Sequence, residues 1–210
     1  QIVAFVIAFA GPPSAEPLFP LIAAGGANPR YSVAAAACPR PLAPYEVEGK
    51  TVACGTVSVP ENHDKPDGRK IVLTFMVLKS HSEAPAPDPV VYLHGGPGSG
   101  VVRNPILITR FLNEMRDRRD IITFDQRGVD TSAGPDSRCY ATVANPDTLG
   151  QAIAASGSET EMIRLGRQAI RSCLDEIAAT GADVSTINTQ QNARDVQALM
   201  DQAGITKAVF

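Results

Sequence analysis

The stretch that most limits how this chain folds runs from Pro89 to Gly98 and reads PVVYLHGGPG. Its first part, Val90 to Leu93, is β-branched, aromatic and aliphatic, which is typical of a strand covered on both faces. Three glycines follow within five residues. Glycine adopts backbone conformations that are barred to other residues and lets a ligand approach the backbone closely. The stretch therefore predicts a buried strand that runs directly into a ligand-binding turn.

The hydrophobic pattern predicts strands and helices along the rest of the chain. Strands are expected at 51–59, 70–79, 89–93 and 120–124, with another beginning at 205–210. Helices are expected at 106–118, 160–180 and 188–203. The first two strands flank a polar turn and form a hairpin. Strands alternate with helices after residue 88, which favours an α/β fold whose parallel strands are joined by right-handed crossovers.

The composition is that of an ordinary globular chain with one sizeable core. The 210 residues are 44% hydrophobic and 20% charged, and the net charge is −3. A nucleic-acid partner is not expected, because such proteins carry a basic patch or stripe. A zinc or thioredoxin-like site is not expected either, because the chain has no Cys-x-x-Cys pair. No other metal-ligand cluster stands out in the sequence.

The first 37 residues are expected to lie outside the folded domain, which we place at 38–210. Residues 2–10 form an apolar run that Gly11-Pro12-Pro13 ends. This run is too short for a stable membrane span, which needs about 20 residues. It resembles the apolar core of a secretory signal peptide, although a buried strand is the alternative. An Ala-, Pro- and Gly-rich linker follows. We expect the protein to be secreted or associated with the cell envelope.

Four cysteines bear on whether the protein is exported: Cys38, Cys54, Cys139 and Cys173. Four cysteines allow three pairings. In an exported chain we favour the pairs Cys38–Cys54 and Cys139–Cys173, because each ties a loop-rich segment to a neighbouring regular element. In a cytosolic chain the alternative is four buried free thiols.

Three short motifs follow predicted strands or open a predicted helix. They are His94-Gly95-Gly96-Pro97-Gly98, Asp125-Gln126-Arg127-Gly128 and the segment 188–195, which reads NTQQNARD. Together they resemble the prolyl aminopeptidase and tripeptidyl aminopeptidase group of α/β-hydrolase serine peptidases. Residues 54–62 also resemble the opening strand of secreted tripeptidyl members. The resemblance covers residues 38–210.

The resemblance implies the N-terminal half of an α/β-hydrolase fold, truncated before the nucleophile elbow. In the family the catalytic Ser, Asp and His all follow the strand that begins here at Lys207. The chain contains no Gly-x-Ser-x-Gly, so none of the triad is expected in it and it is expected to be inactive alone. Ser132 and Ser99 are rejected as nucleophiles, because neither lies on a strand-to-helix elbow.

The resemblance also assigns roles to residues beside the site. Gly96 is the expected oxyanion-hole donor, with Gly95 beside it. His94 and Gly98 are expected to be structural. Asp125 and Arg127 follow a predicted strand, where α/β sheets build their sites; we expect them to pair with each other and fix the loop beside the turn, and substrate binding is the alternative.

Three functions remain open from the sequence. The first is an aminopeptidase that releases prolyl or tripeptidyl units through an acyl-enzyme, without a cofactor. An esterase or lipase of the same fold is the second, and a non-catalytic binding domain is the third. The expected partner is a short peptide or a small amide or ester substrate. His63 and His81 lie in polar connections and are expected to be solvated.

Overall fold

A computed structural model of the protein describes residues 28–95, 99–102, 104–129, 132 and 157–210. Five strands form one mixed sheet in the order β1-β2-β3-β5-β4. The pairs β1–β2, β2–β3 and β3–β5 are antiparallel, whereas β4 and β5 are parallel. Their bounds are Ser32–Ala36 (β1), Val52–Pro60 (β2), Lys70–Leu78 (β3), Val90–Tyr92 (β4) and Ile121–Phe124 (β5).

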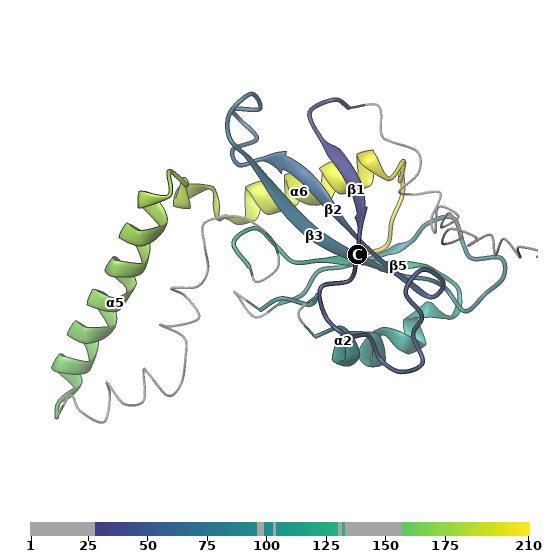
Figure 1. The fold of residues 1–210 in the computed structure, drawn as a ribbon, viewed down its shortest axis with the longest axis horizontal. Coiled ribbons are helices and arrows are strands. Elements are labelled where there is room, and N and C mark those ends of the chain that lie inside the picture. Colours follow the sequence, from purple (N-terminus) through teal and green to yellow (C-terminus); the bar gives the residue numbers. More distant parts are fainter. Residues whose placement is uncertain (1–27, 96–98, 103, 130–131, 133–156) are drawn as a thin grey trace, which may run out of the picture.

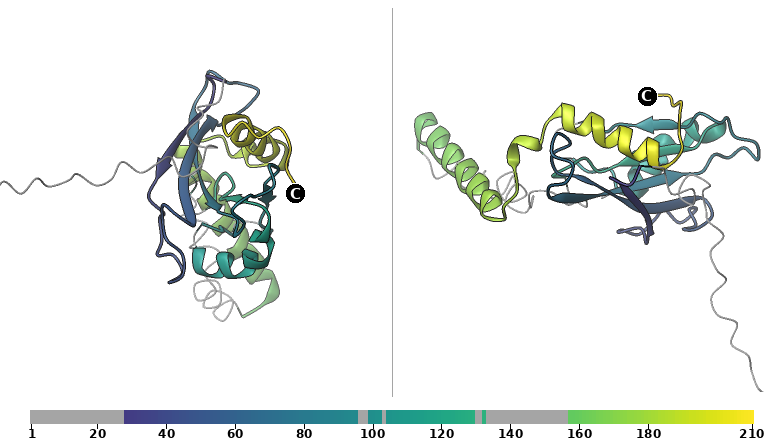
Figure 2. Two further views of the ribbon diagram at one scale, coloured as in Figure 1. Left: turned by 90° about the vertical axis from the view of Figure 1, so that its right-hand side faces the viewer. Right: turned by 90° about the horizontal axis from the view of Figure 1, so that it is seen from above.

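Two helices cover opposite faces of this sheet (Figure 1 and Figure 2). Helix α2 (Pro105–Leu112) packs on one face, and helix α6 (Thr189–Gln202) packs on the other. Strand β3 supplies both layers, because alternate side chains of a strand point to opposite faces. Phe75 lies in the layer under α6, and Met76 lies in the layer under α2. This α/β arrangement, with β2 and β3 as a hairpin, matches the sequence prediction.

Strand β1 lies inside the segment that the sequence analysis assigned to a linker. Its residues are small, and four of the five are exposed, so they show no alternating hydrophobic pattern. Alanine is also a weak strand former. The strand forms because β2 offers it an edge, and Gly55 of β2 lies opposite Ala35. A Cβ atom there would lie 2.5 Å from the ring of Phe75 and 2.8 Å from the carbonyl oxygen of Ala34.

The helix expected at 106–118 is divided in two. Helix α2 ends at Leu112, and a 3₁₀ turn, η1 (Asn113–Asp117), follows it. This tighter turn contains Arg116, which is buried and pairs with the buried carboxylate of Glu46. Its guanidinium also donates to the carbonyl oxygens of Lys79 and Thr51. The change from α-helix to 3₁₀ turn after Leu112 therefore coincides with hydrogen bonds from Arg116 to distant parts of the chain.

Helix α5 (Glu159–Ala179) projects away from the sheet (Figure 1 and Figure 2). Its Cys173 and Ile177 are buried, and they pack with Ala182 and Val184 near the 3₁₀ turn η2 (Val184–Thr186). No helix within the described ranges is both long and apolar enough to cross a bilayer. The signal-like run at 2–10 lies outside the described residues.

The strand expected at 205–210 is represented by one parallel bridge. Val209 pairs with Val90 of β4. Its carbonyl oxygen accepts from the Val91 N–H at 2.8 Å, and its own N–H donates to the Pro89 carbonyl oxygen at 2.9 Å. The chain at Val209 therefore runs alongside β4 in the same direction.

Ion pairing also holds the start of β4 against the start of β5. The Arg119 guanidinium donates to the Asp88 carbonyl oxygen at 3.0 Å and to the Asp88 carboxylate at 3.3 and 3.4 Å. This hydrogen bonding holds the pKa of Asp88 below its ordinary value of 3.8.

Candidate functional site

The expected glycine turn leaves the sheet at the carboxyl end of β4. His94 and Gly95 follow that strand, and Gly95 is exposed. The Tyr92 hydroxyl lies 3.2 Å from His94 Nδ1. On the other side, the His94 carbonyl oxygen accepts a hydrogen bond from Gln126 Nε2 at 3.1 Å. Gly96 and Gly98 lie outside the described residues, so the oxyanion assignment remains a prediction.

Asp125 holds the chain on the far side of this turn. Its carboxylate accepts from the backbone N–H groups of Val101, at 2.6 Å, and Val102, at 2.9 Å. Asp125 itself is buried, and its own N–H donates to the carbonyl oxygen of Thr74 at 3.0 Å. Charge-assisted bonds of this kind are stronger than neutral ones, so they hold this loop firmly.

The expected pair between Asp125 and Arg127 is wrong. Arg127 instead forms a bidentate pair with the buried carboxylate of Asp195 in α6, at 2.8 Å through Nε and 2.7 Å through Nη2. Its other N–H groups donate to the carbonyl oxygens of Pro60, Glu61 and Thr186. A guanidinium has five donors, so these partners use all of them. No donor remains for Asp125.

His63 is buried rather than solvated, which corrects another expectation. Its side chain is 4% exposed, and its Nε2 lies 2.8 Å from the Asp195 carboxylate. Its backbone N–H donates to the side-chain oxygen of Gln191 at 2.9 Å. His81, by contrast, has a 45% exposed side chain, as expected. The hairpin turn after β2 is thus bonded to α6 by residues that are distant in sequence.

We call Arg127, Asp195 and His63 the buried charge cluster. Sequence reasoning missed Asp195 and His63 as members, although Asp195 closes the third motif and that position was the available signal. Asp183 caps the 3₁₀ turn η2 beside the cluster, and its carboxylate accepts from the Ser185 hydroxyl. That hydrogen bond holds the pKa of Asp183 below its ordinary value.

Ser132, rejected above as a nucleophile, is a buried bridging residue. Its hydroxyl donates to the carbonyl oxygen of Asp125 and accepts from the Thr74 N–H at 3.1 Å. Its relative exposure is 6%, so a substrate does not reach it. Ser99, the other rejected serine, is exposed and lines the cavity beside the glycine turn.

That cavity has a volume of about 360 Å³. It is lined by His94 and Gly95, by Gln126, and by Asn188 and Asn192 from the start of α6. Asn192 Nδ2 donates to Gln126 Oε1 at 3.2 Å, so two side-chain amides connect α6 to the glycine turn. Asn192 Oδ1 is buried and has no hydrogen-bond partner in the described part of the chain.

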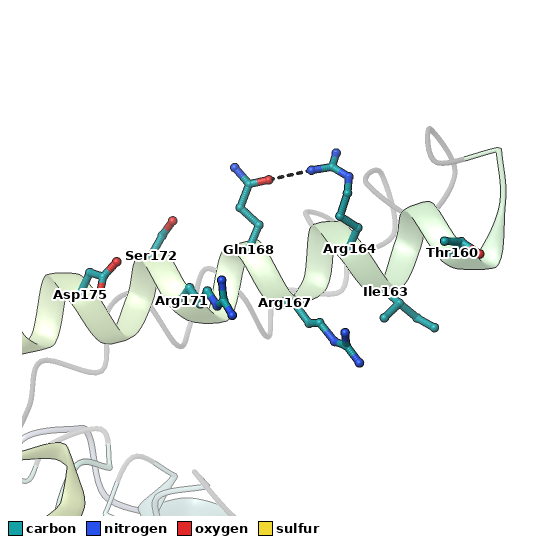
Figure 3. Close-up of a pocket in the computed structure, with 8 residues that line it drawn as sticks. All are labelled: Thr160, Ile163, Arg164, Arg167, Gln168, Arg171, Ser172 and Asp175. Carbon is teal, nitrogen blue, oxygen red and sulfur yellow. Dashed lines mark hydrogen bonds between the residues drawn. The ribbon is translucent and has the colours of Figure 1, made fainter.

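A larger cavity of about 570 Å³ lies along α5 (Figure 3). The residues that line it in the figure all come from this one helix, and Arg164, Arg167 and Arg171 are among them. Arg164 donates to Gln168 and forms a bidentate pair with Glu161, which holds the pKa of Glu161 below its ordinary value. These partners form an exposed helix face, and no acid–base pair with a nucleophile lies among them.

A disulfide joins Cys38 to Cys54, as expected, and so ties the chain after β1 to β2. Cys173 is also disulfide-bonded. Cys139 lies outside the described residues, so the second pairing remains a prediction.

Comparison with known proteins supports a peptidase relationship. No family model matches the chain. The chain is 25% identical over 167 residues to serine protease Hip1 of Mycobacterium tuberculosis, which covers 75% of this chain and 30% of that protein. It is 26% identical over 171 residues to a tripeptidyl aminopeptidase of Streptomyces lividans, with coverage of 75% and 30%. The chain thus spans about a third of the length of these relatives, and its similarity is to proteins of the serine-peptidase kind.

Proposed function

We propose that this chain forms the oxyanion-turn half of an α/β-hydrolase serine peptidase that acts at peptide N-termini. One observation carries the proposal. Val209 runs parallel to β4, so the chain after it emerges at the same sheet edge as His94 and Gly95. In α/β-hydrolases the nucleophilic serine follows one strand, and a backbone N–H from a loop after another strand completes the oxyanion hole. The parallel alignment of Val209 with β4 supports the proposal.

Three further findings agree with this proposal. The sheet order places β5 between β3 and β4, with β4 and β5 parallel, and helices lie on both faces. Ligands of open α/β sheets bind at the carboxyl ends of such strands. The similarity to proteins named serine protease and tripeptidyl aminopeptidase favours peptides as the substrate class. The disulfide favours secretion or the cell envelope.

The reaction would be acyl transfer in two steps. A serine of the full-length protein attacks the scissile carbonyl, and the amine leaves with a proton from the general acid. Water then attacks the acyl-enzyme and releases the acid. The N–H of Gly96 would donate to the developing oxyanion, together with the N–H after the serine. One such donor lowers the barrier by about 3 kcal/mol.

The test uses the full-length protein from its native source or from its complete gene. We expect a tagged fluorophosphonate to label it and a tripeptidyl anilide to be hydrolysed. Gly96→Pro removes the donor and should lower kcat by about 10²–10³-fold, whereas Gly96→Ala keeps the N–H and retains more activity. Hydrolysis of acyl esters alone would indicate an esterase. A folded protein that resists labelling would be a binding domain, and the proposal would be wrong.

A further inference from the structure

Strand β1 leaves one edge of the sheet open. It stands last in the strand order, and within the described residues no strand pairs with its outer side. At the opposite edge, β4 is bridged by Val209. An open edge presents unpaired backbone N–H and C=O groups, which native proteins usually protect with charged side chains, proline or a bulge. The five residues of β1, SVAAA, contain no charge and no proline, and their register with β2 has no bulge.

The register shows which backbone groups of β1 point outward. In an antiparallel pair, residues that bond to the partner strand alternate with residues whose N–H and C=O groups point away from it. A Cβ atom on Gly55 would lie 2.8 Å from the Ala34 carbonyl oxygen, so that oxygen points toward β2. The Glu61 N–H donates to the Arg69 carbonyl oxygen at 2.8 Å, so odd-numbered residues of β2 face β3 and even-numbered ones face β1. The two neighbours of Ala34 therefore direct their backbone groups outward.

These outward groups fit a second copy of the same strand. When two β1 strands run antiparallel with Ala34 opposite Ala34 of the second copy, Val33 of each lies opposite Ala35 of the other. Each of these two pairs exchanges two backbone hydrogen bonds, which gives four in all. The residues at the centre carry only methyl groups, so no large side chain obstructs the approach. The two strands are then related by a two-fold axis, as in most homodimers.

The same register brings two opposite charges together at each end of the paired strands. Arg30 of one copy comes alongside Cys38 of the other. The Cys38 N–H donates to the Glu48 carboxylate at 2.7 Å, so this carboxylate lies at that end of β1. Both Arg30 and Glu48 are exposed, and neither forms an ion pair with another described residue. The two-fold axis therefore creates two Arg30–Glu48 contacts between the copies.

We propose that the open edge of β1 is an interface between two copies of this protein, paired antiparallel about Ala34 and held at both ends by Arg30 and Glu48. This interface joins the two sheets into one continuous sheet, and it does not depend on the proposed peptidase function. Five short residues cover less surface than the roughly 800 Å² per partner of a standard interface. The dimer should therefore form at high protein concentration and dissociate on dilution.

Sedimentation velocity of the full-length protein at increasing concentration measures this association. We expect the mass to rise from that of a monomer toward that of a dimer. Ala35→Pro removes an outward donor and leaves the bonds to β2, which come from Ala34 and Ala36. Proline is accepted in an edge strand where its missing N–H faces solvent. This variant should keep a native circular dichroism spectrum and stay monomeric at concentrations where the wild type associates.

Charge variants distinguish this interface from any other. Arg30→Glu brings carboxylates together, and Glu48→Arg brings guanidinium groups together. Each change affects two exposed contacts, so each variant alone should self-associate about 10-fold more weakly. An equimolar mixture of the two variants should restore association, because a mixed dimer has opposite charges at both ends. Arg110→Glu on the exposed side of α2 is the control and should associate like the wild type.

Three results would overturn the proposal. The first is a full-length protein that stays monomeric at every concentration. The second is a dimer that Ala35→Pro leaves intact, because its interface then lies elsewhere on the molecule. The third is a mixture of Arg30→Glu and Glu48→Arg that associates no more strongly than either variant alone, since the register about Ala34 requires the two charges to meet.

Discussion

Removal of Arg127 should destabilise the protein far more than removal of a neighbouring surface arginine. In Arg127→Met the buried carboxylate of Asp195 loses two charge-assisted hydrogen bonds, and three backbone carbonyl oxygens lose their donor. The two side chains of the pair are 1% and 0% exposed, so water does not replace the lost bonds. Breaking a buried pair by removing one partner costs about 3–5 kcal/mol. We expect a loss of this size in the free energy of unfolding.

Arg194→Met is the matched control. Arg194 lies on α6 next to Asp195, and it bonds to Asp64, which follows His63 in the hairpin turn. Its ion pair is 2.6 Å long, but the side chains are 39% and 62% exposed. An exposed pair contributes about 0–1 kcal/mol. Urea unfolding of the full-length variants, followed by circular dichroism, measures both changes. Equal losses in the two variants would refute the idea that the buried charge cluster holds the hairpin to α6.

Other variants test separate parts of the fold. Gly55→Ala should lower the free energy of unfolding by about 1–3 kcal/mol in urea titrations, because the added methyl group overlaps an aromatic ring and a backbone carbonyl. Cys38→Ser, paired with Cys54→Ser, opens a link across 16 residues and should cost about 3 kcal/mol by thermal unfolding. Because the folded pKa of Asp88 is lowered, its pair with Arg119 stabilises the fold above pH 3.8 and loses that effect as the pH falls through the folded pKa. Arg119→Leu should raise the pKa of Asp88 in an NMR titration and weaken the acid dependence of stability.

Local pattern accounts for the strands and helices that bury a regular set of side chains. Strand β3 alternates between two apolar layers, and α6 places its apolar residues at helical spacing, so both were predictable. Strand β1 carries no such signal, because its small residues are mostly exposed and only their pairing with β2 makes them a strand. The division of the helix after Leu112 depends on tertiary bonds of Arg116, which no local pattern encodes.

The site was predictable to a smaller extent. The motif around His94 and the motif around Asp125 do lie together at one sheet edge, because both follow neighbouring strands. The partner of Arg127 was not predictable from spacing, since Asp195 lies 68 residues away. His63 reads as a loop residue because its neighbours are polar. Only the packing of α6 on the sheet brings it into contact with a buried carboxylate.

The bond from Arg127 to the carbonyl oxygen of Thr186 has a consequence for how such proteins diversify. This 3.3 Å bond joins the chain just after β5 to the chain just before α6, and Gly128 lies against Ile187 beside it. In the described part of this stretch, helix α5 projects away from the sheet and packs with Ala182 and Val184, whereas Ser132 and Asp183 bond to the core. The entropic cost of lengthening a loop closed in this way grows only slowly with its length. Changes in the length of helix α5 should therefore leave the packing of the five-stranded sheet unchanged.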